Sequence, residues 1–190
     1  MIFLKLNLTY KRIIIISCII SILVGIFLHF AYNLSDKNNI VGLFAPVNES
    51  TFEHLKLLFI PYTLFGILFF IAYHNKLSNI PILTFLGNIV GMFVIVTLYY
   101  FSLNFPNISG AVTNIVIYII GVITSYYIFY LGLYDKEFYN ETKESNIIGV
   151  CALTLLFTLF VTNTYSPIKT LLTIDPQTKT YGIYEKSKIY

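Results

Sequence analysis

The chain has 190 residues, of which 57% are hydrophobic and only 11% are charged. A water-soluble domain cannot bury so much apolar surface, so the composition predicts a single membrane domain with the lipid bilayer as its surroundings. The formal charge of +3 comes from 12 basic and 9 acidic residues scattered along the chain, which argues against a nucleic-acid-binding surface.

Five apolar stretches are long enough, or nearly so, to cross a bilayer, which needs about 20 residues of helix. The first four cover residues 13–31, 55–73, 80–103 and 112–133. The fifth, residues 147–164, is the weakest because Thr158, Thr162 and Asn163 reduce its apolar character. The sequence therefore predicts an all-α, polytopic bundle of about five transmembrane helices, followed by a polar C-terminal tail at residues 165–190.

An odd number of spans places the first long loop, residues 33–53, and the C-terminal tail on the same face of the membrane. If the N-terminus is cytoplasmic, the 12 basic residues divide evenly between the two faces. Lys186 and Lys188, and marginally Lys179, lie too far from a helix end to count in the positive-inside rule. The charges therefore predict a multi-pass protein of the cell membrane with a cytoplasmic N-terminus.

Small residues recur at a spacing of four in the third and fourth stretches. Gly87 and Gly91 form a GxxxG step, and Gly121 with Ser125 forms a looser version of it. Such steps are typical of close helix packing in membranes. The Gly87 and Gly91 pair is also a candidate contact for an oligomer.

The segment of residues 46–58 is the richest in polar groups, and it precedes and enters the second apolar stretch. Asn48 or Ser50 can cap the second helix, and Ser50 followed by Glu53 has the spacing of a capping box. Capping accounts for Ser50 and Glu53, but it leaves the other ionisable residues of the segment without a role.

Helical spacing would place Glu49, Glu53 and Lys56 on one face, where Lys56 can pair with Glu53, and would turn His54 about 100° away from Glu53. Ionisable groups at the start of a membrane helix usually face the bundle interior or a wet cavity. His29, near the end of the first stretch, lies on the same side of the membrane as His54 in either topology. The tail can add a further polar group.

That group is Asp175, which is followed by Pro176 and, further on, by Gly182. This pattern is typical of a turn in which the aspartate side chain bonds to the backbone. The alternative is that Asp175 joins the polar groups of the first loop over the mouth of the bundle.

The run from Pro46 to Lys56 resembles the PVNES-x-WEH-x-K signature of a family of small uncharacterised multi-pass membrane proteins from clostridia and related bacteria. Phe52 stands where that pattern has Trp. The regions around His29 and residues 175–182 are also similar to that family, so the resemblance spans most of the chain. It implies that the three regions belong together, and it implies no activity. The richness in Ile, Asn, Lys, Tyr and Phe also fits a low-GC bacterial genome.

Two functions remain open at this point. The first is binding of a polar or lipid-headgroup ligand, or a proton-coupled step, at a mouth formed by the first loop, the second helix and the tail. The candidate site residues are His29, Asn48, Glu49, Glu53, His54, Lys56 and Asp175.

The alternative is a membrane-embedded, metal-assisted hydrolase. Zinc accepts two histidines and a carboxylate with water as the fourth ligand, and His29, His54 and either Glu49 or Glu53 would supply that set. The chain has no H-E-x-x-H motif. No cofactor is therefore predicted outright, and a divalent metal is retained as the alternative.

Overall fold

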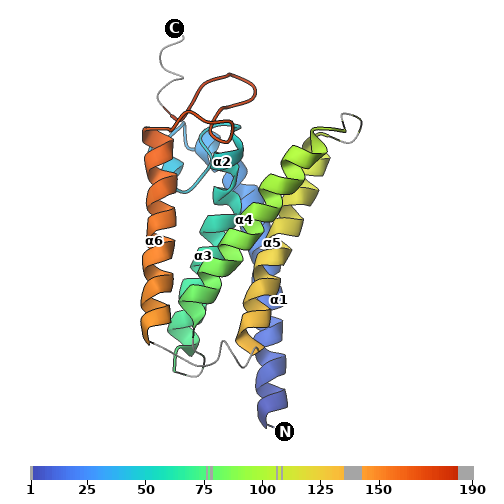
Figure 1. The fold of residues 1–190 in the computed structure, drawn as a ribbon, viewed down its shortest axis with the longest axis vertical. Coiled ribbons are helices and arrows are strands. Elements are labelled where there is room, and N and C mark those ends of the chain that lie inside the picture. The colour runs from blue at the N-terminus through green and yellow to red at the C-terminus, as the bar shows by residue number, and fades with distance from the viewer. Residues whose placement is uncertain are drawn as a thin grey trace.

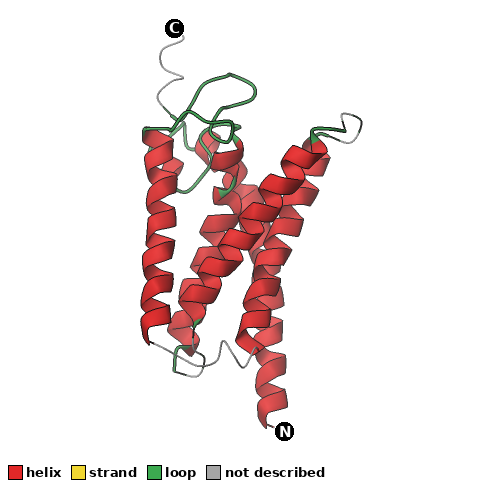
Figure 2. Cartoon of the chain, in the orientation of Figure 1, coloured by secondary structure: helices red, strands yellow, loops and turns green. Residues whose placement is uncertain are grey.

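The computed structural model of the chain describes residues 2–75, 77, 79–105, 107, 109–134 and 143–183, and the side chains of residues 2–8 and 143 lie outside that description. Within these ranges the secondary structure is helical without strands, and five helices are long and apolar enough to cross a membrane (Figure 2). The all-α, multi-pass fold predicted from the sequence is confirmed. Four of the basic residues that entered the orientation argument lie outside the described residues, namely Lys76, Lys136, Lys186 and Lys188.

The five long helices are α1 (Ile2–Leu34), α3 (Lys56–Tyr73), α4 (Ile80–Ser102), α5 (Ala111–Tyr134) and α6 (Lys143–Tyr165). Two short helices, η1 (Val41–Leu43) and α2 (Thr51–His54), lie in the first long loop. In Figure 1 the N-terminal end of α1 lies at the bottom, whereas α2 and the described part of the tail lie at the top. The passage of α6 along the bundle thus brings the polar loop and the tail to the same end.

The second span begins earlier than the apolar pattern indicated, because α2 and α3 together form a candidate span of residues 51–73. Pro61 lies inside α3 and has no N–H to donate to the carbonyl oxygen of Leu57. The hydroxyl of Tyr118 in α5 lies 3.4 Å from that oxygen and 3.1 Å from the carbonyl oxygen of Ser21, so its one hydrogen is shared between them. A side chain of a neighbouring helix therefore gives the Leu57 carbonyl a polar contact that lipid would not.

Small residues allow α4 and α5 to pack closely at the centre of the bundle. A Cβ atom on Gly91 would lie 2.8 Å from the carbonyl oxygen of Gly121, and one on Gly87 would lie 2.8 Å from that of Ser125. The hydroxyl of Tyr62 donates to the same Ser125 oxygen at 3.1 Å. The glycine steps therefore mediate helix packing inside the chain, as one of the two sequence interpretations expected.

Tyrosines of α5 attach the middle of α1 to the bundle. The hydroxyl of Tyr126 donates to the carbonyl oxygen of Ser17 at 3.1 Å and lies 2.7 Å from the Ser21 hydroxyl. The hydroxyl of Tyr118 lies 3.1 Å from the carbonyl oxygen of Ser21. Gly25, one turn further, lets α1 approach α3, since a Cβ there would lie 2.6 Å from the Leu57 oxygen.

The hydroxyls that made the fifth stretch look weak are satisfied within α6 itself. Thr158 donates to the carbonyl oxygen of Thr154, and Thr162 donates to that of Thr158, each at 2.9 Å. Both threonines are exposed on the outer surface of the bundle. Because each hydroxyl is bonded to the turn before it, the helix can face lipid with these residues at a reduced cost.

Candidate functional site

Ser50 begins α2 as its N-cap. Its hydroxyl accepts a hydrogen bond from the backbone N–H of Glu53 at 3.3 Å, and its own N–H donates to the side-chain oxygen of Asn48 at 2.9 Å. Asn48 also donates to the carbonyl oxygen of Gly182 in the tail at 3.4 Å. Both polar residues proposed as caps thus have structural partners, and Asn48 links the loop to the tail.

Glu53 and Lys56 form a buried ion pair, with 2.7 Å between Nζ and Oε2. Lys56 also donates to the carbonyl oxygen of Gly42 at 2.9 Å and to the hydroxyl of Thr164 in α6 at 2.6 Å. Thr164 in turn donates to Glu53 Oε1 at 2.8 Å. This network, the Glu53–Lys56–Thr164 network, ties α3 to the first loop and to α6.

Glu49 does not share a face with Glu53, although a continuous helix would have placed it there. It precedes the N-cap Ser50, whose backbone is extended with φ −69° and ψ 148°, so the chain turns between the two carboxylates. Glu53 and Lys56 are three residues apart and point into the protein, whereas Glu49 and His54 lie on the other side. The polar segment is thereby split into a buried half and an accessible half.

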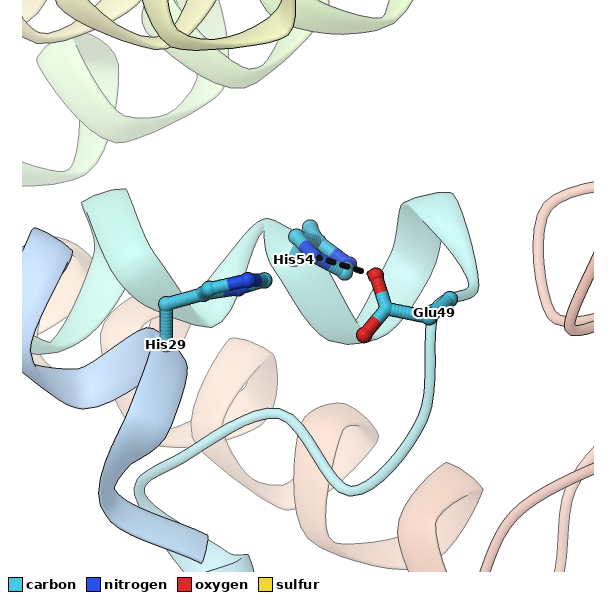
Figure 3. A group of neighbouring side chains, drawn as sticks. All are labelled: His29, Glu49 and His54. Atoms are coloured by element: carbon cyan, nitrogen blue, oxygen red, sulfur yellow. Dashed lines mark ion pairs between the residues drawn. The ribbon is translucent and has the colours of Figure 1, made fainter. Parts of the chain in front are cut away.

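His29, Glu49 and His54 form the accessible half, and we call them the His29–Glu49–His54 group (Figure 3). One nitrogen or oxygen atom of each lies within 4.8 Å of the other two. His54 Nε2 is 3.4 Å from Glu49 Oε2, and the two histidine rings have centroids 5.1 Å apart. The three side chains come from α1, the first loop and α2.

The positions of the histidines follow from the close approach of α1 and α3. Gly25 meets Leu57, and His29 lies four residues beyond Gly25 on the same face of α1. His54 lies three residues before Leu57 and so on the same face of its helix. One glycine contact therefore brings the histidines together one turn further toward the loop. The side chains of His54 and Glu49 are 27% and 43% exposed.

Both ring nitrogens of His54 face oxygen atoms. Nδ1 lies 3.0 Å from the carbonyl oxygen of Ser50, and Nε2 lies 3.4 Å from Glu49. A neutral imidazole has a single N–H and can donate to only one of them. The other contact needs either a second proton on the ring or a cation between the nitrogen and the carboxylate.

A cavity of about 570 Å³ opens beside the three side chains and is bounded by α1, α2, α3, α4, α5 and the tail. Its large aliphatic and aromatic lining residues without a polar group are Ile26, Phe30, Leu57, Ile95, Ile115 and Ile117. Its uncharged polar lining residues are Thr51, Tyr99, Asn114, Tyr118 and Gln177. The cavity thus combines one polar corner with a wall that is mostly hydrocarbon.

Asp175 joins the tail to the loop that carries Glu49. Its carboxylate accepts hydrogen bonds from the backbone N–H groups of Gln177 at 2.8 Å, Thr178 at 3.2 Å and Glu49 at 3.5 Å. Burial raises the pKa of Asp175, but these bonds and one from the Thr178 side chain outweigh it and hold the pKa below its ordinary value. The predicted turn is present, and Asp175 in addition fastens the tail beside the accessible half.

The lining of the cavity extends beyond the residues that the sequence indicated. Thr51 could have been found, because it lies three residues before His54 on the same short helix. Tyr99 and Asn114 come from α4 and α5, and Gln177 from the tail. No spacing in the sequence relates those three residues to the polar segment, so only the packing of the helices shows them.

Comparison with known proteins gives a family but no activity. No curated protein matches the chain, and no solved structure matches it either. A family model described as a family of unknown function, DUF6512, matches residues 2–183, a range that includes all of the site. The chain is therefore a member of this family of unknown function.

Proposed function

We propose that this protein binds a divalent metal ion, with zinc as the best fit, through His29, Glu49 and His54, and that the metal holds the polar end of a ligand in the adjoining cavity. The observation that carries the proposal is the convergence of these three side chains on one corner of a large, mostly apolar cavity. Two imidazoles and a carboxylate are a common ligand set for zinc, and three protein ligands leave a fourth position open.

The distance between His54 and Glu49 supports a metal. Two ligand atoms that each lie about 2.1 Å from zinc at a tetrahedral angle are about 3.4 Å apart. The Nε2 to Oε2 distance is 3.4 Å. All three ligand atoms lie within 4.8 Å of one another, and the proposal requires a side-chain rotation of His29 to complete the set.

The surroundings of His54 support the same assignment. With the proton on Nδ1 and donated to Ser50, the Nε2 lone pair points toward Glu49. Metal-bound histidines usually donate their second ring N–H to a carbonyl or carboxylate in this way. A metal ion then replaces the unfavourable contact between the Nε2 lone pair and the Glu49 carboxylate with two bonds.

Ligand binding fits the site better than metal-assisted hydrolysis. Hydrolysis at a zinc site commonly uses a second carboxylate as general base, and the sequence offered Glu53 only as an alternative metal ligand to Glu49. Glu53 is buried and paired with Lys56, away from the cavity. Among the described residues that line the cavity, Glu49 is the one carboxylate, and the proposal uses it as a metal ligand.

Metal analysis of the purified protein tests the proposal. Protein expressed with zinc, purified in detergent and analysed by mass spectrometry should carry one zinc ion per chain. His54→Ala should lower zinc affinity by more than about 100-fold, because loss of outer partners alone costs about 10- to 100-fold. His74→Ala is the matched control, since His74 is exposed at the other end of α3. Wild-type protein that holds no stoichiometric metal would refute the proposal.

We also propose that the N-terminus is cytoplasmic, which puts the metal site near the outer face of the membrane. The support is the distribution of lysines and arginines near helix ends. Tags placed before residue 2 and after residue 190 should differ in protease access in sealed cells, with only the C-terminal tag cleaved. Cleavage of the N-terminal tag instead would reverse the orientation.

A further inference from the structure

The cavity beside the metal site has two chemically different ends. The His29–Glu49–His54 group and Thr51 form one end, next to the tail residue Gln177. Isoleucines from three membrane helices supply much of the remaining lining, and Phe30 lies beside His29 with ring centroids 4.9 Å apart. A ligand that fits both ends has a compact polar head and an apolar chain.

Two of the apolar residues that line the cavity are at least half exposed. Tyr118, whose hydroxyl lies 3.1 Å from the carbonyl oxygen of Ser21 and 3.4 Å from that of Leu57, lines the cavity where α1 and α5 pack together. Phe30 and Ile115 line the cavity and are 54% and 50% exposed. Because both residues lie within candidate membrane spans, an opening between them would face the hydrocarbon of the bilayer.

The tail narrows the approach from water. Pro176 and Gln177 line the cavity on that side. They are held by the bonds of Asp175 to Gln177 and Glu49, and by the donation of Phe52 N–H to the Leu172 oxygen at 2.8 Å. The side toward lipid has no such cover among the described residues.

The charge of the site selects the head group. Glu49 is the one charged residue among the described lining residues, apart from the two histidines, and no lysine or arginine lines the cavity. A divalent ion bound by Glu49 and two neutral imidazoles leaves a single positive charge. One negative charge on the ligand neutralises it, whereas a doubly charged head would be left partly uncompensated in an apolar site.

We infer that the ligand is a single-chain amphiphile with a monoanionic head group, such as a long-chain carboxylate, which reaches the metal from the bilayer. The cavity of about 570 Å³ falls within the range of about 300–1,000 Å³ that is usual for sites that hold one small molecule. An anionic oxygen of the head takes the open metal position, while the chain lies along Ile26, Phe30 and Ile115. This inference rests on the proposed metal site.

Binding of defined amphiphiles to zinc-loaded protein in detergent tests the inference. Palmitate should displace a fluorescent fatty acid at least tenfold better than acetate, hexadecanol or inorganic phosphate. Hexadecylphosphate, which is close to doubly charged at neutral pH, should bind more weakly than palmitate. Removal of zinc with a chelator should weaken palmitate binding at least tenfold.

Two neighbouring residues of α5 provide a matched pair of variants. Ile115 and Val116 are at the same depth and are 50% and 48% exposed, but only Ile115 lines the cavity. Ile115→Asn should weaken palmitate binding at least fivefold while zinc content stays at one per chain. Val116→Asn should leave both unchanged.

The outcomes separate the two proposals. Absence of stoichiometric zinc would overturn the metal site itself. Stoichiometric zinc with acetate or hexadecanol binding as well as palmitate would overturn the amphiphile inference alone, and so would tighter binding of hexadecylphosphate. Equal effects of Ile115→Asn and Val116→Asn on palmitate binding would show that the chain does not lie in this cavity, and would likewise overturn the inference.

Discussion

Replacement of Lys56 by methionine should destabilise the protein strongly. Lys56 is fully buried, and its ammonium group bonds to Glu53 at 2.7 Å, Thr164 at 2.6 Å and Gly42 at 2.9 Å. Methionine has a similar volume, so the change removes the charge and leaves little cavity. The Glu53 carboxylate then stays buried without its cation.

The size of the effect follows from the burial of both partners. Removal of one member of a buried ion pair costs about 3–5 kcal/mol. For a domain of 150–250 residues, each kcal/mol lowers the melting temperature by about 2–4 °C, which gives a decrease of about 6–20 °C. Thermal denaturation in detergent, followed by circular dichroism, measures it.

A double variant separates the lost pair from the lost packing. Lys56→Met combined with Glu53→Gln removes both charges and should recover at least half of the loss, because no isolated charge remains buried. Lys37→Met, at an exposed lysine of the same loop, should change stability by less than about 0.5 kcal/mol. A Lys56→Met protein that melts within about 2 °C of the wild type, or a double variant less stable than the single one, would refute the reasoning.

Three further changes test other contacts, with melting in detergent as the measurement unless stated. Gly91→Ala should destabilise by about 1–3 kcal/mol because its Cβ would lie 2.8 Å from a carbonyl oxygen of α5, whereas Gly110→Ala, with nothing within 4 Å, should be neutral. Phe52→Trp should not lower stability, because Phe52 borders an apolar groove of about 230 Å³ between α4 and α6. The folded pKa of Asp175 lies below the ordinary aspartate value of 3.8, so its contribution to stability is present above about pH 4 and is lost as the pH falls through the folded pKa. Asp175→Asn should therefore speed proteolysis of the tail at neutral pH, while the wild-type tail should loosen only below pH 3.8.

The features that the sequence could predict depend on local spacing or on total hydrophobicity. Apolar length predicted the five spans, and spacings of three along a helix predicted the Ser50 cap and the pairing of Glu53 with Lys56. The odd number of spans predicted that the tail and the first loop lie at one end. Each of these predictions needs only the geometry of one helix or the fact that the number of spans is odd.

The division of the polar segment needed the three-dimensional structure. Helical spacing placed Glu49 on the same face as Glu53, but the extended backbone at Ser50 turns the two carboxylates to opposite sides of the segment. Thr164, more than 100 residues along the chain, completes the buried half, and His29 completes the accessible half. Which residues of other helices meet the polar segment depends on helix packing at contacts such as Gly25. No local sequence pattern predicts these contacts.

The buried and accessible halves of the polar segment have different partners. Glu53 and Lys56 form an ion pair inside the protein, and the hydrogen bond from Lys56 to Thr164 ties this pair to α6. His54 and Glu49, whose side chains are 3.4 Å apart, are held by different contacts, His54 to the carbonyl oxygen of Ser50 and Glu49 through its backbone N–H to the carboxylate of Asp175. The proposed ligand site requires this separation, because the groups that hold the scaffold are then different from those that would meet the ligand. Loss of metal binding in His54→Ala with unchanged melting, set against loss of stability in Lys56→Met, is the pair of results that this division of roles requires.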